Sequence, residues 1–508
     1  MVYVNTDKNQ TYLVPQKITD LFSKDHVCYL IEQIAESMDY SKFDVKYEGA
    51  GRPAYHPRIL IKLTLIAGVD NIMSSRRIAK NAQENVVYIY LAEKTQPDFR
   101  TICNFKKNNP ELINEASFQL SKFAYEHGMI DLSHLMVDGT IIKSSANGDR
   151  ILDKETLKKL SNYIDNFLKK SIKVDEEEDK IYGDRAMHEL PEDLNDSEKR
   201  RPIVRKIVDE INKNMNEGKK ANVEQIKKEL QNIEQTMEER GLKKYSLTDP
   251  DSRFMLNKKG KIELSYNAQI VTDKNGLIIA DDVVQQADDT HQLVPCIEKV
   301  EQKFGKLPEG TKVSADAGYA NGEQMEILDK KGYDLYIPGK NSKPETKDKK
   351  FAKANFTYDE QKDNYICPEN KILKNNSTFF SNKQQRQMII YKCLDCPTCT
   401  HHDTCCKTNK YRAIHAIPQD RLLNKIKEKL QTIDGKETYK LRKQTVERSF
   451  GDIKENKKFR SFLTRGIRKV KTEFKLACIT HNLVMINNLI KKKTTTNQQN
   501  PIFLANTC

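Results

Sequence analysis

The chain has 508 residues, which is enough for two or more domains with well-buried cores. Lys and Arg number 86 against 72 Asp and Glu, and the net charge of +14 favours a polyanionic partner, although basic composition alone is weak evidence. No apolar run approaches the ~18 residues needed to cross a bilayer, and the start of the chain lacks a basic segment followed by a hydrophobic one. These observations exclude a membrane protein and lead us to expect a cytoplasmic location.

Residues 1–130 are predicted to be helical, because apolar residues recur at helical spacing in segments such as 58–67. Ser74 is a candidate N-cap for a helix that carries Arg76 and Arg77. A Pro-Asp turn and a second basic helix follow, and this order suits a helix-turn-helix DNA reader. An all-helical packing domain with solvated basic residues explains the same pattern equally well.

Strand patterns begin near Leu132, and an apolar run then ends at Asp138, which is followed by glycine. The Asp138 carboxylate is therefore expected at the mouth of a buried strand. Residues 150–245 interrupt this pattern with helical sequence rich in Lys and Glu. We predict that they form an inserted helical arm whose charges are mostly solvated.

The strand pattern resumes after this insertion. Residues 261–271 and 277–284 have the pattern of two strands joined by a hairpin turn. A helix is predicted over 291–304, and a short strand then ends at Asp316, which is followed by Ala-Gly. Strands, a helix and a second strand bearing a carboxylate predict an α/β core.

Residues 340–420 form a second insertion, which is rich in cysteine. Cysteines at two-residue spacing in a cytosolic protein more often bind metal than form disulfides. Four of them suit a structural Zn²⁺ site: Cys393, Cys396, Cys399 and Cys405. Possible substitutes are Cys367, Cys406, His401 and His402. An iron-sulfur cluster and reduced, unliganded thiols are the alternatives.

A third carboxylate, Glu447, follows this insertion. Apolar Val446, Phe450 and Ile453 recur at helical spacing, so Glu447 is predicted on an amphipathic helix that faces inward. Two aspartates on strands and a glutamate on a helix supply the separate oxygen ligands that a pair of divalent ions requires. Any single Asp-Gly motif is more often a turn signal, but the three motifs together outweigh that explanation.

Several further segments accompany these carboxylates along almost the whole chain. They are Gly51–Pro57, Ser74–Ile78, Pro97–Ile102, Asp138–Thr140, Thr248–Arg253, Tyr266–Gln269, Ala315–Tyr319, Tyr439–Lys454 and His481–Leu483. In this combination and order, the chain resembles the DDE transposases of bacterial insertion sequences, in particular the eleven-eighty-two group. The resemblance implies a ribonuclease-H-like catalytic core in which Asp138, Asp316 and Glu447 bind two Mg²⁺ or Mn²⁺ ions.

The resemblance also implies an activity: metal-dependent cleavage of DNA at insertion-sequence ends, followed by strand transfer into target DNA. The expected partners are double-stranded DNA, as terminal inverted repeats and target, and a second copy of the chain in the active complex. A nucleoid-associated location would follow. Two alternatives remain open, namely a catalytically inactive DNA-binding relic and a nuclease of the same core that does not join strands.

One spacing departs from the pattern of the wider class, in which an arginine lies four residues before the glutamate. Arg442 lies five residues before Glu447. On a continuous helix, at ~100° per residue, Lys443 projects within about 40° of Glu447 and Arg442 about 140° away. This favours Lys443 as the phosphate contact, while Arg442, Lys454 and Tyr439 remain candidates for binding DNA.

The predicted fold is an α/β ribonuclease-H-like mixed-sheet catalytic core with an all-helical N-terminal domain, a helical insertion and a Cys-rich insertion. The expected boundaries are 1–130 for the helical DNA-binding domain, 131–490 for the catalytic domain interrupted by 150–245 and 340–420, and 491–508 for a polar tail.

Overall fold

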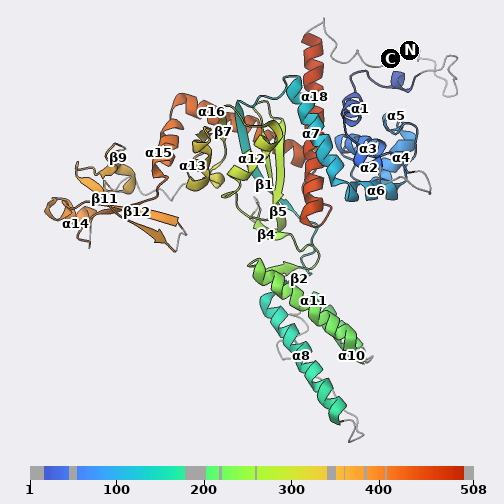
Figure 1. Cartoon of the computed structure of the whole chain (residues 1–508), viewed down its shortest axis with the longest axis horizontal. Helices are drawn as coiled ribbons and strands as arrows, with labels where there is room; N and C mark the ends of the chain where they lie inside the picture. The colour runs from blue at the N-terminus through green and yellow to red at the C-terminus, as the bar shows by residue number, and fades with distance from the viewer. Residues whose placement is uncertain are drawn as a thin grey trace, which may run out of the picture.

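The structure is a computed structural model that describes residues 17–44, 54–177, 202–216, 220–257, 260–339, 350–359, 361–382, 386–406 and 409–496. Parts of the sequence predictions lie outside these residues, including Gly51–Pro53 of the first motif and most of the predicted polar tail. In Figure 1 a central sheet lies between the N-terminal helices and a second, smaller sheet, and a helical arm projects away from it.

The N-terminal region is helical, as predicted. Its α-helices are α1 (Cys28–Glu36), α2 (Ser41–Asp44), α3 (Pro57–Val69), α4 (Ser75–Glu84), α5 (Val86–Leu91), α6 (Phe99–Asn108) and α7 (Pro110–Glu126). Helix α3 is almost entirely buried because its side chains are apolar nearly all round. Its buried Lys62 is balanced by ion pairs with Glu32, at 2.9 Å, and Glu93, at 2.8 Å.

The predicted helix-turn-helix order omitted one element. Helix α5 lies between α4 and α6, and the Asn85 side chain caps it by accepting hydrogen bonds from the backbone N–H groups of Val87 and Tyr88. The predicted cap Ser74 makes no capping hydrogen bond through its side chain. The ammonium of Lys106, on α6, donates to the backbone oxygen of Met73, in the segment just before α4, at 3.1 Å.

The central sheet is mixed. Its strands are β1 (His134–Lys143), β4 (Arg253–Leu256), β5 (Ile262–Thr272), β6 (Ile278–Val284), β7 (Lys312–Ser314) and β8 (Asp334–Tyr336). They run in the order β4-β5-β1-β7-β8, and β6 also pairs with β5. Strand β5 is antiparallel to β1, β4 and β6, whereas β1, β7 and β8 are mutually parallel neighbours. The hairpin predicted between residues 261 and 284 is confirmed.

Helices cover both faces of this sheet. Because successive strand residues point to opposite faces, Leu135 and Val137 of β1 pack with α12 (Leu293–Phe304) and α13 (Gly322–Lys330). Met136 packs on the other face, in a cluster with α17 (Val446–Gly451) and α18 (Ile467–Thr496). Asp138 and Thr140 share the alternation of Met136, so they lie on the α17 face.

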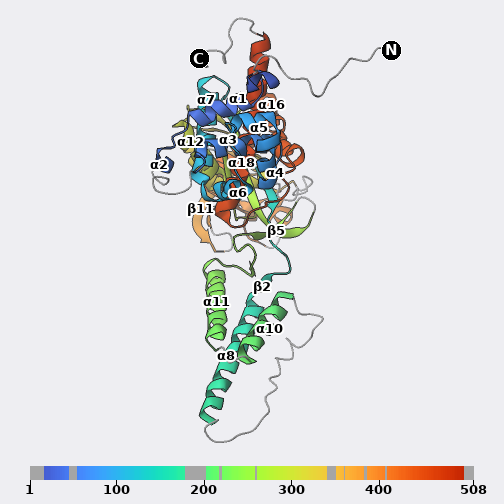
Figure 2. The same cartoon turned by 90° about the vertical axis from the view of Figure 1, so that its right-hand side faces the viewer.

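Helix α18 packs against both the N-terminal helical region and the central sheet (Figures 1 and 2). Its first half packs in the central-sheet cluster through residues such as Phe474, and its second half packs in the helical-domain cluster through residues such as Leu483. Asn482 connects it to β6 by exchanging two hydrogen bonds with the backbone of Ile278, at 2.9 and 2.7 Å. The helix ends at Thr496, beyond the domain boundary at 490 expected from the sequence.

The helical character predicted for residues 150–245 is confirmed within the described residues. Strands β2 (Ile151–Asp153) and β3 (Lys244–Ser246) pair at the base of the arm, and helices α8 (Lys154–Glu177), α10 (Pro202–Asn216) and α11 (Lys220–Glu239) extend from it. The arm has an apolar cluster of its own. Residues 178–201, in its middle, lie outside the described part of the chain.

The Cys-rich insertion forms a separate antiparallel sheet that follows β8 in the chain. Its strands are β9 (Thr357–Asp359), β10 (Asn364–Ile366), β11 (Ile372–Ser381), β12 (Arg386–Lys392) and β13 (Ala413–Ala416), and each pairs with its neighbours in sequence order. A single helical turn, α14 (His402–Cys405), lies between β12 and β13. Helices α15 (Asp420–Lys429) and α16 (Ile433–Gln444) then return the chain to the central sheet.

Candidate active site

Asp138 lies in the middle of β1. The strand continues to Lys143, because β5 pairs with it from Met136 onward, so the prediction that Asp138 lies at the mouth of a strand is wrong. The following glycine has a packing role and not a turn role. A Cβ atom on Gly139 would lie 2.5 Å from the Gln269 amide nitrogen and 2.6 Å from a carboxylate oxygen of Asp289. The Asp-Gly pair therefore marks close packing beside the carboxylate.

Asp316 lies two residues after the end of β7, close to the predicted strand end. Its side chain accepts a hydrogen bond from the backbone N–H of Gly318 at 2.7 Å and caps the short 3₁₀ turn Ala317–Tyr319. The parallel register pairs Met136 of β1 with Ser314 of β7. Asp138 and Asp316 each lie two residues beyond this pair, so the first two carboxylates come from β1 and from the segment that follows its neighbour β7.

Glu447 is brought to Asp138 by a break between two helices. Helix α16 ends at Gln444, Thr445 has φ −111° and ψ −88°, and α17 begins at Val446. The break is stabilised locally, since the Thr445 hydroxyl donates to the backbone oxygen of Leu441 at 3.0 Å. The helical-wheel prediction assumed a continuous helix through this point and therefore fails.

Because of this break, Arg442 contacts the carboxylates, although the helical wheel favoured Lys443. The Arg442 guanidinium pairs with Glu447 at 2.7 Å and with Asp138 at 3.3 Å, whereas Lys443 is exposed. The Glu447 side chain is 40% exposed, so it lies at the rim of the cluster and does not face inward as predicted.

Charge holds the Arg442 guanidinium in this buried position. Burial opposes its charge, but Asp138, Tyr439, Glu447 and Asp316 outweigh that effect and raise its pKa. The Arg442 side chain is only 10% exposed, and its Nη1 atom makes no hydrogen bond of good geometry despite its proximity to Asp138. All three predicted carboxylates therefore act electrostatically on one buried cation.

The other predicted DNA-binding residues lie in two places. Lys454, in the π-helical turn Asp452–Asn456, donates a hydrogen bond to the Thr140 hydroxyl on β1. The Tyr439 ring centroid lies 5.9 Å from the Arg442 guanidinium carbon. Arg76 and Arg77 are exposed on α4, in the helical domain, outside this cluster.

Sequence reasoning missed a fourth carboxylate, Asp289. It accepts hydrogen bonds from Asn267 at 2.7 Å and from Gln269 at 2.6 Å, and the Tyr319 hydroxyl donates to the Gln269 amide oxygen. Burial raises the pKa of Asp289, the two amide hydrogen bonds oppose that rise, and the nearby charge of Asp316 adds to it. The motif Tyr266–Gln269 could have indicated a carboxylate partner, but nothing in it specified Asp289.

The donor atoms suit a hard divalent cation, because carboxylate oxygens are the ligands that Mg²⁺ and Mn²⁺ prefer. Within the described residues, however, no group of three or more His, Cys, Asp or Glu side chains is arranged closely enough to hold a metal ion. The Arg442 guanidinium lies between Asp138 and Glu447 and neutralises part of their charge. A divalent cation would have to take over that role.

The predicted zinc ligands come together in the Cys-rich sheet. A small cavity there is lined by Cys393, Cys396, Cys399 and Cys405, and also by Cys367, Cys406 and His402. His401 does not line it, and its ring nitrogen lies 3.6 Å from the Glu369 carboxylate. All six of these cysteines are free thiols.

Two segments of the chain match models of protein families. Residues 366–486 match the family described as Transposase DDE domain, and residues 16–108 match the family described as Transposase domain (DUF772). The first match contains Arg442 and Glu447 but begins after Asp138 and Asp316. A comparison with curated proteins gives no match. No helix among the described residues is long and apolar enough to cross a membrane. Two segments of the chain are therefore similar to transposase domains.

Proposed function

We propose that this transposase cleaves DNA at the ends of its insertion sequence and joins the freed ends to target DNA, with divalent metal ions bound at Asp138, Asp316 and Glu447. The observation that carries the proposal is that the buried guanidinium of Arg442 pairs with Asp138 of β1 and Glu447 of α17, and that the charge of Asp316, after β7, also acts on it. Such a site combines oxygen ligands from separate elements with a phosphate-binding cation.

We infer that the central sheet is a ribonuclease-H-like core. The support is its strand order, in which the antiparallel strands β6, β5 and β1 are followed by β7 and β8 running parallel to β1. Asp138 lies on β1, which comes first in the chain among these five strands. Asp316 follows β7, the fourth, and Glu447 lies on α17, which packs on the face of the sheet that carries Asp138. This is the order that the resemblance implied.

Each site residue then has a role that its contacts favour. Asp138 supplies a ligand oxygen from strand β1, Asp316 supplies one from the turn after β7, and Glu447 supplies one from the more exposed rim. Two bound Mg²⁺ ions, or Mn²⁺ ions, would activate the attacking water or 3′ hydroxyl and stabilise the leaving oxygen. Arg442, released from the carboxylates, is placed to bind the phosphate by two parallel hydrogen bonds.

Lys454 and Tyr439 flank this site, and we assign to them contacts with the DNA backbone near the cleaved bond. The helical domain is assigned to the terminal repeats. Arg76 and Arg77 are exposed on α4, and Arg76 lies over the Phe99 ring at 5.0 Å, an arrangement that holds its guanidinium at the surface. Two ends joined in one complex require two such domains, which favours a homodimer.

The test is Mg²⁺-dependent cleavage and joining of a labelled DNA duplex that carries one end of the insertion sequence. Wild type is compared with Asp316→Asn and with the matched control Asp329→Asn, whose aspartate is exposed on α13. Joined product from wild type and the control, but not from Asp316→Asn, supports the proposal.

Three other results would contradict it. Hydrolysed ends without joined product would indicate a nuclease. Tight binding of the end without any cleavage would indicate an inactive DNA-binding relic. Equal activity in Asp316→Asn and wild type would remove Asp316 from the site.

A further inference from the structure

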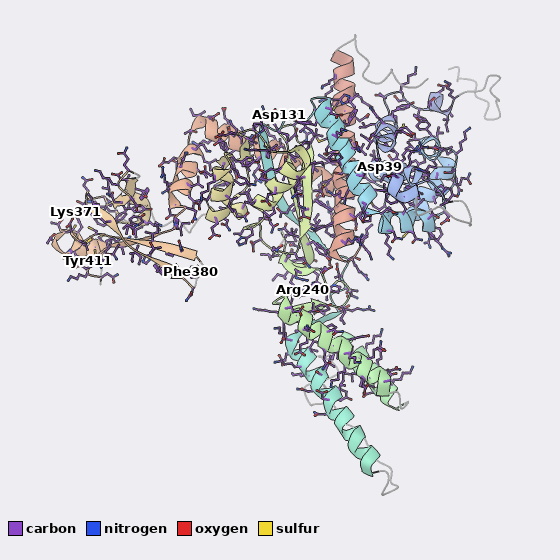
Figure 3. All side chains as sticks on the ribbon, in the orientation of Figure 1. Asp39, Asp131, Arg240, Lys371, Phe380 and Tyr411 are labelled. Carbon is purple, nitrogen blue, oxygen red and sulfur yellow. The ribbon has the colours of Figure 1, made fainter. Side chains whose placement is uncertain are left out.

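Six cysteines from three separate segments meet at the cavity of the Cys-rich sheet. Cys367 lies in the turn between β10 and β11, Cys393, Cys396 and Cys399 lie in the loop after β12, and Cys405 and Cys406 lie at the end of α14. They are six of the 11 cysteines of the chain. Figure 3 places Lys371, which also lines the cavity, at the end of this sheet that points away from the central sheet. This cluster therefore lies outside the candidate active site.

Backbone N–H groups contact the sulfur at two of these positions. The Cys367 sulfur accepts hydrogen bonds from the backbone N–H groups of Glu369, at 3.4 Å, and Lys371, at 3.2 Å. The turn that makes this possible includes Asn370 at a left-handed φ of 58°. The Cys396 sulfur accepts from the backbone N–H of Arg412 at 3.4 Å. These contacts hold two of the sulfurs in place at the cavity.

Three of the thiols are buried together in the core of the sheet. Cys393, Cys396 and Cys406 belong to one core cluster, and their exposed fractions are 1% for Cys393, 7% for Cys396 and 5% for Cys406. Lys371 and Arg412 line the cavity together with Glu369. Four thiolates around a divalent cation carry a net charge of −2, and the basic residues at the cavity outnumber the acidic one.

We propose that Cys367, Cys393, Cys396 and Cys406 bind one structural Zn²⁺ ion, which completes the core of the Cys-rich sheet. Four sulfur ligands close the coordination shell and leave no position for substrate, as in structural zinc sites. Binding releases the four thiol protons to solvent. Because no three side chains already have the spacing of metal ligands within the described residues, the sulfurs must rotate into the cavity as the ion binds.

This ligand set differs from the one predicted from spacing alone. Cys367, Cys399 and Cys405 are all half-buried. Among the described residues, backbone N–H groups contact the sulfur of Cys367 but not those of Cys399 and Cys405. The His402 ring is engaged outside the cluster, since its Nε2 lies 3.3 Å from the backbone oxygen of Lys410. Cys367, which the sequence indicated only as a substitute ligand, lies 26 residues before Cys393 and reaches it through the pairing of β10 with β11 and β11 with β12.

The test is the metal content of the full-length chain, purified without added metal and measured by elemental analysis. We expect one zinc and no iron per chain. Cys396→Ser and Cys367→Ser should lose most of the zinc, whereas the matched control Cys399→Ser should keep it. A chain with iron and inorganic sulfide would overturn the proposal, as would a chain with no metal. Zinc loss in Cys399→Ser alone would overturn the ligand set.

A second measurement uses the wild-type chain only and so does not depend on how the variants fold. Zinc is replaced by Co²⁺, and the intensity of the sulfur-to-cobalt absorption is compared with that of known sites with two, three or four thiolates. Four thiolates are expected. A two-thiolate spectrum, or a thiol count showing disulfides in place of bound metal, contradicts the proposal.

Discussion

The central sheet and the Cys-rich sheet are stabilised in different ways. Among the described residues, the central sheet has apolar clusters on both faces, with 20 buried residues on the α12 side and 16 on the α17 side. The described part of the Cys-rich sheet has a cluster of nine buried residues, and three of these are the cysteines Cys393, Cys396 and Cys406. A core of that size supplies little hydrophobic stabilisation, and small domains of this kind usually need a metal or a disulfide.

Because of this difference, the two sheets differ in how they can accommodate buried polar side chains. The central sheet can bury Asp138 and Arg442 together because the apolar clusters on its two faces hold the strands in register regardless of the site. The Cys-rich sheet has a smaller apolar cluster, which contributes less stability. Its proposed metal site is part of its core, so we expect metal to decide whether that sheet folds.

The largest expected effect is a change in hydrogen exchange that should occur in the Cys-rich sheet and not in the central sheet. Removing zinc with a chelator should increase amide hydrogen exchange across β9–β13 by roughly 100-fold or more, because about 3 kcal/mol of local stability depends on the metal. Exchange in β1 and β5 should change little. Mass-spectrometric exchange of the full-length chain, with and without chelator, measures both. Equal protection of β9–β13 in both samples would show that this sheet does not need metal.

The next effect concerns the cation inside the central sheet. Arg442→Gln should lower the free energy of unfolding by about 3 kcal/mol, because it leaves the carboxylates around it without their counter-charge. Mg²⁺ should then raise the melting temperature of this variant more than that of wild type, since the ion replaces the lost charge. Thermal unfolding with and without Mg²⁺ tests both points.

Lys443→Gln is the matched control for that variant, because Lys443 is adjacent but exposed. It should change stability by less than about 0.5 kcal/mol. A larger loss in Lys443→Gln than in Arg442→Gln would restore the helical-wheel interpretation and refute the contacts of Arg442 described above.

A smaller effect tests the packing beside Asp138. Gly139→Ala should cost about 2 kcal/mol, because its Cβ would clash with Gln269, Asp289 and the Tyr319 hydroxyl, at 2.5, 2.6 and 3.0 Å. Gly148→Ala is the control, since a Cβ there meets nothing within 4 Å. Chemical denaturation compares the two. A neutral Gly139→Ala would mean that this glycine has only a turn role.

The smallest effect is a pH dependence of the free energy of unfolding, which arises from His134 of β1, next to Ser314 of β7. Burial lowers the pKa of His134 from its ordinary 6.5 to about 4, and the imidazole lies 2.7 Å from the Ser314 hydroxyl. The charged groups that act on it are Lys312, Lys274, Asp334 and Asp131. The unfolded chain binds the proton more readily, so stability should fall as pH drops below 6.5. The loss should be about 1 kcal/mol between pH 7 and 5.5.

The matched variant is His134→Gln, which keeps a polar partner for Ser314 and cannot titrate. Its free energy of unfolding should vary less with pH than that of wild type over this interval. Parallel pH profiles for the two proteins would show that His134 titrates alike in the folded and unfolded chains.

Much of the central sheet could be predicted because its signals are local. The hairpin between β5 and β6 follows from alternating apolar residues and its turn residues, and Asp316 follows from an apolar run that ends at Asp-Ala-Gly. The positions of Asp138 and Glu447 within their elements could not be predicted. Strand β1 is extended by its pairing with β5, and the helix break at Thr445 depends on backbone angles that the flanking helical sequence does not specify.

Two features depend on contacts between distant residues. Asp289 lies in a loop and becomes part of the site only through Asn267 and Gln269 of β5. Cys367 reaches the other thiols only through strand pairing in a sheet that the cysteine spacing did not predict. Register between strands is set by packing across the sheet, and a single sequence does not contain that information.

The measurement that most directly tests the account is DNA cleavage at the insertion-sequence end by Asp138→Asn, Glu447→Gln and the double variant. Residues that act as one unit have non-additive effects. We predict that each single variant loses activity by roughly 10³-fold or more and that the double variant is no slower than either. Losses that multiply in the double variant, or a single variant that retains wild-type cleavage, would show that Asp138 and Glu447 do not form one catalytic site.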